Sequence, residues 1–121
     1  MNPAPFEATA AQLDDGVRVV AVRGELDLST APDLEGPLDA AVSSGDTSVL
    51  VDLAECEFID STGIALIVRT WQRLDGDSES SGQVVICCAN EQVRRVLEIT
   101  GIELSIPIHD SREQALAALR D

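Results

Sequence analysis

The chain has 121 residues, of which 45% are hydrophobic and 25% are charged. This length suits one folded domain, and the hydrophobic content lies well above that of disordered chains. Eight basic and 22 acidic residues give a formal charge of −14, which argues against binding to nucleic acid or anionic lipid and favours a partner with a basic face. A simple need for solubility would also explain the acidity. We expect a single domain over residues 1–121, with its core at about 6–119.

Neither a membrane-spanning segment nor a secretory signal is indicated. No apolar run approaches the roughly 20 residues of a spanning helix, and the N-terminal stretch MNPAPFEATA lacks the basic start and apolar stretch of a signal peptide. We therefore expect a cytoplasmic protein. Cys56, Cys87 and Cys88 form no CxxC motif, so we interpret them as buried packing residues in a reducing compartment rather than as disulfide or zinc ligands.

The chain opens with a predicted antiparallel hairpin. Residues 6–13 and the β-branched run 17–22 flank a turn-like Asp-Asp-Gly segment, which is typical of a hairpin at the edge of a sheet. Ser29 or Thr30 can then cap a helix that reaches about Val42.

A buried strand and an amphipathic helix follow. Residues 48–53 form an apolar run of strand length, as expected for a strand covered on both faces. A short loop leads to the tetrapeptide 60–63 and a helix with one apolar stripe. The stripe residues lie at i, i+3, i+4 and i+7: Ile64, Ile67, Val68 and Trp71. The polar tract 75–82 is predicted to be a surface loop.

The last third of the chain predicts two more strands and two helices. A short buried strand covers residues 83–88, and Asn90 can cap a helix that stops at Gly101. Residues 106–109 form the last strand, and Ser111 begins a capping box for a final amphipathic helix. Strands that alternate with helices predict an α/β fold, with a sheet that is mainly parallel beyond its edge hairpin.

Enzyme chemistry finds little support in the sequence. There is no GxSxG, GxxxxGK[ST] or GxGxxG motif, and the single histidine, His109, is more simply interpreted as a capping or surface residue than as a catalytic one. Four carboxylates, Asp52, Glu55, Glu57 and Asp60, are interpreted as solvated loop charges rather than as a metal or acid–base cluster. We predict that the protein is not an enzyme and holds no metal and no cofactor.

The tetrapeptide Asp60-Ser61-Thr62-Gly63 places two hydroxyls at a helix start. Capping of the helix by Asp60 or Ser61 would by itself account for polar residues there. On the residues alone, a capping role and a functional role both remain open.

A resemblance to a known family favours the functional role. The segment DLAECEFIDSTG resembles the D-L-x-x-x-x-F-[ILM]-D-S-[ST]-G signature of STAS domains in the bacterial anti-sigma factor antagonists. The GELD tetrapeptide at residues 24–27 and the helix at 89–101, which ends in Thr-Gly, also resemble that family. The resemblance implies a single STAS domain: a mostly parallel open sheet with an antiparallel edge hairpin and amphipathic helices.

What the resemblance implies for function is a phosphorylation switch at Ser61. The unphosphorylated protein would bind an anti-sigma factor with serine kinase activity and so release a sigma factor. Phosphorylation of Ser61 by that kinase would inactivate it, and a metal-dependent serine phosphatase would restore it. The expected partner-binding residues lie in two loops: Asp27, Leu28, Ser29, Asp60, Thr62 and Gly63. Gly63 is expected to let a partner's backbone approach closely.

Two alternatives remain on the sequence. STAS modules without a phosphorylation switch bind nucleotides or serve in transporters, lipid-trafficking systems or stressosome-like assemblies, and an enzyme of unknown type is the weaker second alternative.

Overall fold

A computed structural model describes residues 6–13, 16–43, 48–76 and 83–120. Its sheet has the strand order β1-β2-β3-β4-β5. The strands are β1 (Glu7–Gln12), β2 (Val17–Leu26), β3 (Ser48–Ile59), β4 (Gln83–Cys87) and β5 (Ile108–His109). Only β1 runs antiparallel to its neighbour, so the predicted edge hairpin on a mainly parallel sheet is confirmed. The Asp14-Asp15 part of its turn lies outside the described residues.

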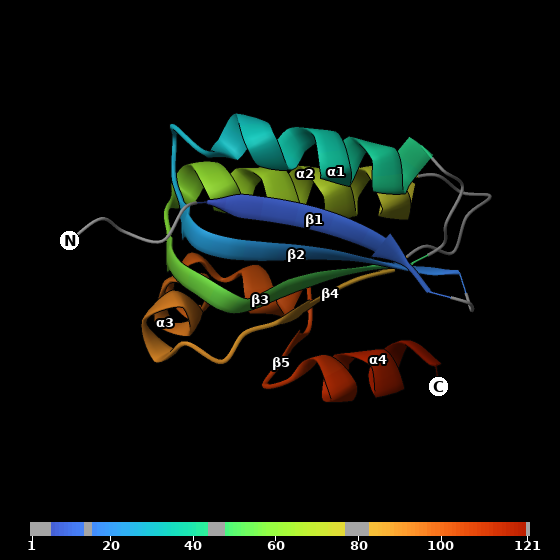
Figure 1. Ribbon diagram of the computed structural model, residues 1–121. Helices are drawn as coiled ribbons and strands as arrows, with labels where there is room; N and C mark the ends of the chain where they lie inside the picture. Colours follow the sequence, from blue (N-terminus) through green and yellow to red (C-terminus); the bar gives the residue numbers. More distant parts are fainter. Residues whose placement is uncertain (1–5, 14–15, 44–47, 77–82, 121) are drawn as a thin grey trace.

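The helices lie on both sides of this sheet (Figure 1). They are α1 (Ala31–Ser43), α2 (Ser61–Gly76), α3 (Glu91–Thr100), a 3-10 turn (Ile102–Leu104) and α4 (Arg112–Arg120). Helices α1 and α2 lie next to each other on one side, whereas α4 lies on the other and α3 lies beside β3. No helix in the described part of the chain is long and apolar enough to cross a membrane.

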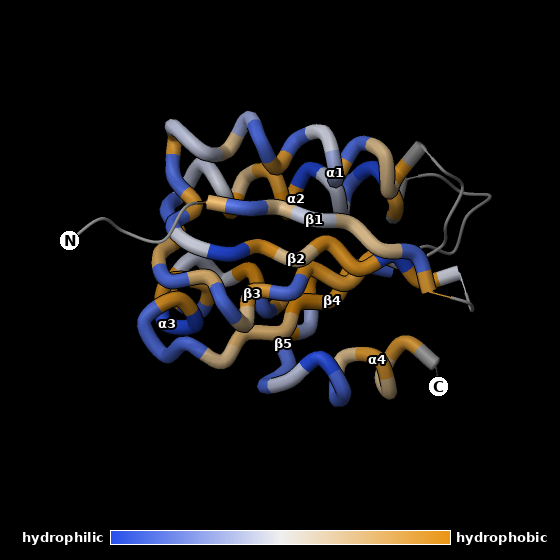
Figure 2. The backbone as a smooth tube through the Cα atoms, in the orientation of Figure 1, coloured by the Kyte–Doolittle hydropathy of each residue, from blue (hydrophilic) through white to orange (hydrophobic). Residues whose placement is uncertain are grey.

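The core follows the alternation of the central strands. On β2, Val20 and Val22 join the cluster beneath α1 and α2, while Val17 and Val19 join a smaller cluster beneath α4. Figure 2 shows the hydrophobic residues concentrated on these inner strands. Because β2, β3 and β4 contribute apolar side chains to both clusters, the prediction of strands covered on two faces is confirmed.

Local caps fix several helix ends. The Asn90 side chain accepts hydrogen bonds from the backbone N–H groups of Gln92 and Val93, and Gly101 ends α3 with φ of 78°, a left-handed conformation that suits glycine. The Ser111 hydroxyl accepts from the backbone N–H of Gln114 at 3.1 Å. The predicted caps of α3 and α4 are therefore confirmed, and all three cysteines are buried and free.

Several predicted boundaries differ from the structure: β2 continues past residue 22 to Leu26, and β5 begins at Ile108 instead of residue 106. Strand β3 does not stop at residue 53 but continues to Ile59, because it stays paired with β2 through two register shifts. Glu55 and Glu57 therefore belong to a strand and not to a loop. Helix α2 extends to Gly76 and therefore includes residues 75 and 76 of the expected polar loop. Residues 77–82 of that loop lie outside the described part of the chain. Helix α1 begins at Ala31, directly after Thr30 as predicted, but the hydroxyls of Ser29 and Thr30 bond to other groups.

Candidate functional site

The carboxyl ends of β2 and β3 lie together at one edge of the sheet. Leu26 and Ile59 are the last paired residues of the two strands, and the backbone N–H of Asp60 donates to the Leu26 carbonyl at 3.2 Å. Asp27 and Asp60 therefore begin two neighbouring loops. This arrangement brings together the two segments that the sequence singled out.

Asp60 caps helix α2. Its Oδ1 accepts from the backbone N–H of Thr62 at 2.9 Å and from that of Gly63 at 3.4 Å, which satisfies two N–H groups that a helix leaves unpaired. Ser61 is the first residue of the helix and is exposed. Within the described residues its hydroxyl has no hydrogen-bond partner. Asp60 therefore caps α2, and the Ser61 hydroxyl is exposed to solvent at the N-terminus of the helix.

The loop after β2 is organised by Asp27. Its Oδ1 accepts from the backbone N–H and the hydroxyl of Ser29, at 3.0 and 2.8 Å, and from the backbone N–H of Thr30 at 3.2 Å. The hydroxyl of Thr30 donates to the Glu25 carbonyl at 2.9 Å. The two hydroxyls thus turn back into the loop instead of capping α1. Chiefly the Ser29 hydrogen bond holds the pKa of Asp27 below its ordinary value, so this carboxylate is charged at neutral pH.

Leu28 stands at the tip of that loop and is 74% exposed. The hydrogen bonds of Asp27 hold the loop backbone on either side of it. Single exposed apolar side chains are common on protein surfaces, so contact between Leu28 and a partner stays a prediction.

Gly63 is buried where α2 begins. A Cβ on this residue would lie 2.6 Å from Cγ and 2.7 Å from Cδ2 of Leu26, closer than carbon atoms can pack. The missing side chain lets the first turn of α2 lie directly on the end of β2. The space at Gly63 is thus filled from within the chain, and contact between Gly63 and a partner's backbone stays a prediction.

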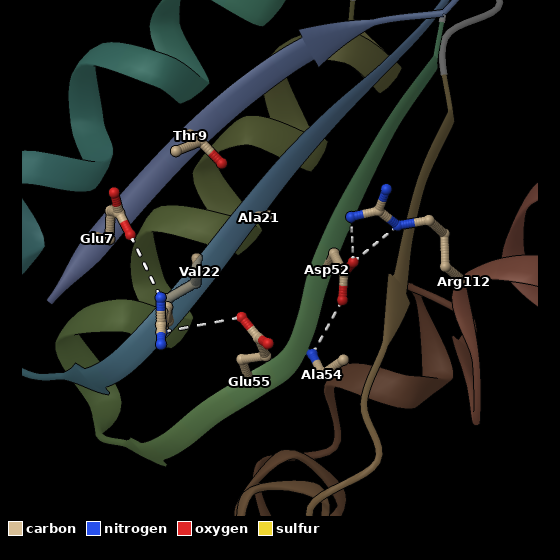
Figure 3. Close-up of a pocket in the computed structure, with 9 residues that line it drawn as sticks. Glu7, Thr9, Ala21, Val22, Asp52, Ala54, Glu55 and Arg112 are labelled. Carbon is tan, nitrogen blue, oxygen red and sulfur yellow. Dashed lines mark hydrogen bonds and ion pairs between the residues drawn. The ribbon is translucent and has the colours of Figure 1, made fainter. Parts of the chain in front are cut away.

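A recess lies on the sheet face opposite α1 and α2 (Figure 3). It has a volume of about 320 Å³. Asp52 accepts two hydrogen bonds from the Arg112 guanidinium, at 2.8 and 2.6 Å, and Arg23 pairs with Glu7 at 3.8 Å and with Glu55 at 4.0 Å. Three carboxylates thus accompany two arginines that are already paired. This charge balance does not favour a phosphate group, so the recess lends no support to the nucleotide-binding alternative.

Asp52 links β3 to helix α4 and is not a solvated loop charge. Only 9% of its side chain is exposed, and it also accepts from the backbone N–H of Ala54 at 2.9 Å and from the Cys87 thiol at 3.2 Å. Burial acts to raise the pKa of Asp52, but the hydrogen bonds from Ala54 and Arg112 outweigh it and lower the pKa. Burial is also the main reason that the pKa of Cys87 rises to about 12. Asp52 and Arg112 therefore form a charged clamp between β3 and α4, beside an unreactive Cys87 thiol.

One exposed aromatic residue was not singled out by sequence reasoning. Phe58 lies near the end of β3 and is 46% exposed, beside a groove against α3. The signature that this segment resembles includes the phenylalanine, but the sequence does not show whether its side chain is buried, and phenylalanine is usually assigned to the core.

These features define an α/β domain with an open serine hydroxyl at a helix start, next to a second ordered acidic loop. The chain belongs to the STAS domain family, whose model matches residues 8–115.

Similar proteins include the anti-sigma-B factor antagonist of Staphylococcus aureus, which is 31% identical over 78% of this chain and 84% of its own length. The anti-sigma-F factor antagonist RsfB of Mycobacterium tuberculosis is 29% identical over 97% of this chain and 93% of its own. The crystal structure of an anti-sigma factor antagonist from Mycobacterium paratuberculosis matches with a TM-score of 0.87 at 30% identity, covering 97% of this chain and 96% of that one.

Proposed function

We propose that this protein is an anti-sigma factor antagonist that binds its anti-sigma factor through the paired loops and is inactivated by phosphorylation of Ser61. The observation that carries the proposal is the Ser61 hydroxyl, exposed and without a hydrogen-bond partner among the described residues, on a helix that Asp60 already caps. The names of the relatives support the general role. The serine kinase activity of the anti-sigma factor and the reversal by a metal-dependent phosphatase are finer parts of the same proposal.

The switch would act through electrostatics at the docking surface. A phosphate adds about −1.5 to −2 charges near neutral pH, and here it would follow Asp60 directly and lie across from the Asp27 loop. Two like unit charges about 4 Å apart repel by roughly 4 kcal/mol at an effective dielectric constant of about 20. The N-terminus of α2 returns only about 0.3–1 kcal/mol. This repulsion lies within the protein itself and does not weaken binding directly, but a partner that packs against the unmodified loops would have to bury the added charge, which costs free energy.

The surrounding structure is expected to stay in place when Ser61 is modified. Leu26 and Asp60 are joined by a backbone hydrogen bond, and Asp27 holds its own loop with its side chain. Neither set of contacts uses the Ser61 hydroxyl. Phosphorylation thus changes the charge and shape of the surface without requiring the domain to refold.

The test compares unmodified and modified protein in binding to purified anti-sigma factors from the same genome. We expect Ser61→Ala to abolish phosphorylation and to keep binding. Ser61→Asp should weaken binding at least about tenfold, because burial of an unpaired charge at the interface costs more than the 1.4 kcal/mol that corresponds to a factor of ten. True phosphoserine should weaken it further, since its charge is larger. Calorimetric titration and phosphosite mapping by mass spectrometry provide the measurements.

Two control variants sharpen this test. Ser105→Asp adds the same charge at another exposed serine and should bind like the wild type. Thr62→Val removes the neighbouring hydroxyl and should still be phosphorylated. Equal affinities of the phosphorylated and unmodified proteins, with both folded by circular dichroism, would contradict the proposed switch.

A further inference from the structure

Strand β1 forms one edge of the sheet. It is the outermost strand in the order β1-β2-β3-β4-β5, and within the described residues it pairs only with β2 (Figure 1). An edge strand carries backbone N–H and C=O groups that can pair with another chain, and proteins often prevent this with lysine, proline or a bulge. The β1 sequence EATAAQ contains no lysine or proline, and its register with β2 has no shift. This edge can therefore accept a further strand.

The hairpin register identifies the backbone groups of β1 that face away from β2. The backbone N–H of Leu13 donates to the carbonyl of Val17 at 2.8 Å, in line with the register of the two strands. Residues of antiparallel strands alternate between hydrogen-bonded and non-hydrogen-bonded pairs. Thr9 and the other odd-numbered residues of β1 therefore bond to the backbone of β2. The N–H and C=O groups of Ala8 and Ala10 consequently point outward from the edge.

The edge of β1 is complementary to itself. When two antiparallel copies are related by a twofold axis at Thr9, Ala8 of each copy lies opposite Ala10 of the other, and their outward N–H and C=O groups bond reciprocally. Thr9 then faces its own copy in a non-hydrogen-bonded pair, where side chains are closest and pairs of threonines are favourable. Glu7 lies opposite Ala11, so like charges do not meet along the joined strands.

Helix α1 leaves room for this arrangement. It lies over β1 and β2, so the α1 helices of the two copies would be neighbours across the axis. Glu35 and Asp39 of α1 are ion-paired with arginines of α2. The other exposed residues among the described side chains of α1 are small apart from one aspartate: Pro32, Asp33, Gly36 and Ala40. Because the distance between packed helices depends on the side chains at the contact, these residues permit a close approach.

We propose that β1 pairs with β1 of a second copy of this chain, which gives a twofold-symmetric dimer with one sheet continuous across both copies. Twofold dimers are the commonest protein oligomers. The contact is separate from the proposed function, because β2 lies between β1 and β3, the strand that leads to Ser61. Ser61 therefore stays exposed in both copies, and one dimer carries two sites for phosphorylation.

The first test is self-association of the purified full chain, measured by sedimentation velocity over a range of protein concentrations. We expect a monomer–dimer equilibrium that salt strengthens, because each copy has a formal charge of −14 and salt screens the repulsion between copies. Ala10→Pro removes an outward N–H but no bond to β2, and edge strands tolerate proline at such positions. Thr9→Lys places two positive charges opposite each other. Each variant should raise the dissociation constant of the dimer at least about tenfold.

A control variant and a cross-linking experiment complete the test. Ser105→Lys adds the same charge at an exposed residue outside the sheet and should dimerise like the wild type. The native cysteines are buried, so Thr9→Cys introduces the exposed thiol of the chain at the axis, where facing Cβ atoms about 4.5–5.5 Å apart come close to the spacing of a disulfide. Under mild oxidation Thr9→Cys should form a covalent dimer faster than Ser105→Cys.

The outcomes that contradict the proposal are distinct. A wild-type chain that stays monomeric at all concentrations would overturn it and would leave this edge to a strand of a different protein. A dimer that salt dissociates, or that folded Ala10→Pro and Thr9→Lys form as readily as the wild type, would place the contact on another surface. Faster cross-linking of Ala10→Cys than of Thr9→Cys would show that the register is wrong.

The proposed function is tested separately from this dimer. Thr9→Lys leaves the serine and both loops of the candidate site unchanged, so it should bind the anti-sigma factor and should lose binding when Ser61 is phosphorylated. If this variant is monomeric and its binding still depends on phosphorylation, the two proposals both stand. If the wild type is monomeric and shows the same dependence, the edge inference alone is wrong.

Discussion

Replacing Gly63 by alanine is expected to lower the free energy of unfolding by about 1–3 kcal/mol, the usual cost of overpacking a core. Helix propensity alone predicts the opposite sign, since alanine is favoured over glycine by about 1 kcal/mol inside a helix. Steric contact decides the outcome here. The added Cβ would lie 2.6 Å from Cγ of Leu26, a fully buried side chain, and protein interiors are close-packed.

Ala65→Gly is the matched control for this prediction. Ala65 is an exposed position in the same helix, so glycine there should lower the free energy of unfolding by about 0.5–1 kcal/mol through helix propensity alone. Urea denaturation of both variants measures the two changes. A gain in stability for Gly63→Ala as large as the loss for Ala65→Gly would show that Leu26 moves aside without cost, which would contradict the packing described here.

Removal of the Arg112 side chain is expected to lower the free energy of unfolding by about 1–3 kcal/mol, because it leaves the buried Asp52 carboxylate without its countercharge. The larger values known for fully buried pairs do not apply, since 51% of the Arg112 side chain is exposed. Arg23→Ala provides the control, because Arg23 and its partners Glu7 and Glu55 are more exposed. That variant should change stability by less than about 1 kcal/mol.

The stability difference between wild type and Arg112→Ala should depend on pH. The folded-state pKa of Asp52 is lowered, so its contribution to stability is complete above the unfolded-state pKa of about 3.9. The contribution is lost as the pH falls through the lower, folded-state pKa. Denaturation curves at a series of pH values should show a constant difference at neutral pH that narrows in acid, as Asp52 becomes protonated in both folded proteins. A gap that widens in acid would contradict the clamp.

The sequence was sufficient for the order of elements and for the position of the serine. Apolar runs, glycine stops and the Asn90 and Ser111 caps are local signals, and each acts within a few residues of its own position. The match to the family signature then drew attention to Ser61. These features could be predicted because none of them depends on which distant segment packs nearby.

The features that escaped prediction all depend on distant partners. Residues 54–57 contain alanine and glutamate, which are rare in strands, and they are held in β3 by pairing with β2. The role of Gly63 follows from Leu26, which lies 37 positions earlier in the chain. The groove at Phe58 exists only because α3 lies beside it. Sequence patterns carry little information about contacts between residues that are far apart in the chain.

The two register shifts between β2 and β3 have a consequence for how this surface can diverge. Strand β2 has 10 residues and β3 has 12, and the shifts at Ala21/Arg23 and Gly24/Glu25 absorb the difference. Deleting the extra residue of β3 at a shift would remove the bulge and leave the pairs on both sides in place, including the pair of Leu26 with Ile59. The serine would then stay beside the neighbouring loop. Such bulges act as length adjusters, so this part of β3 can lose a residue without displacing the serine.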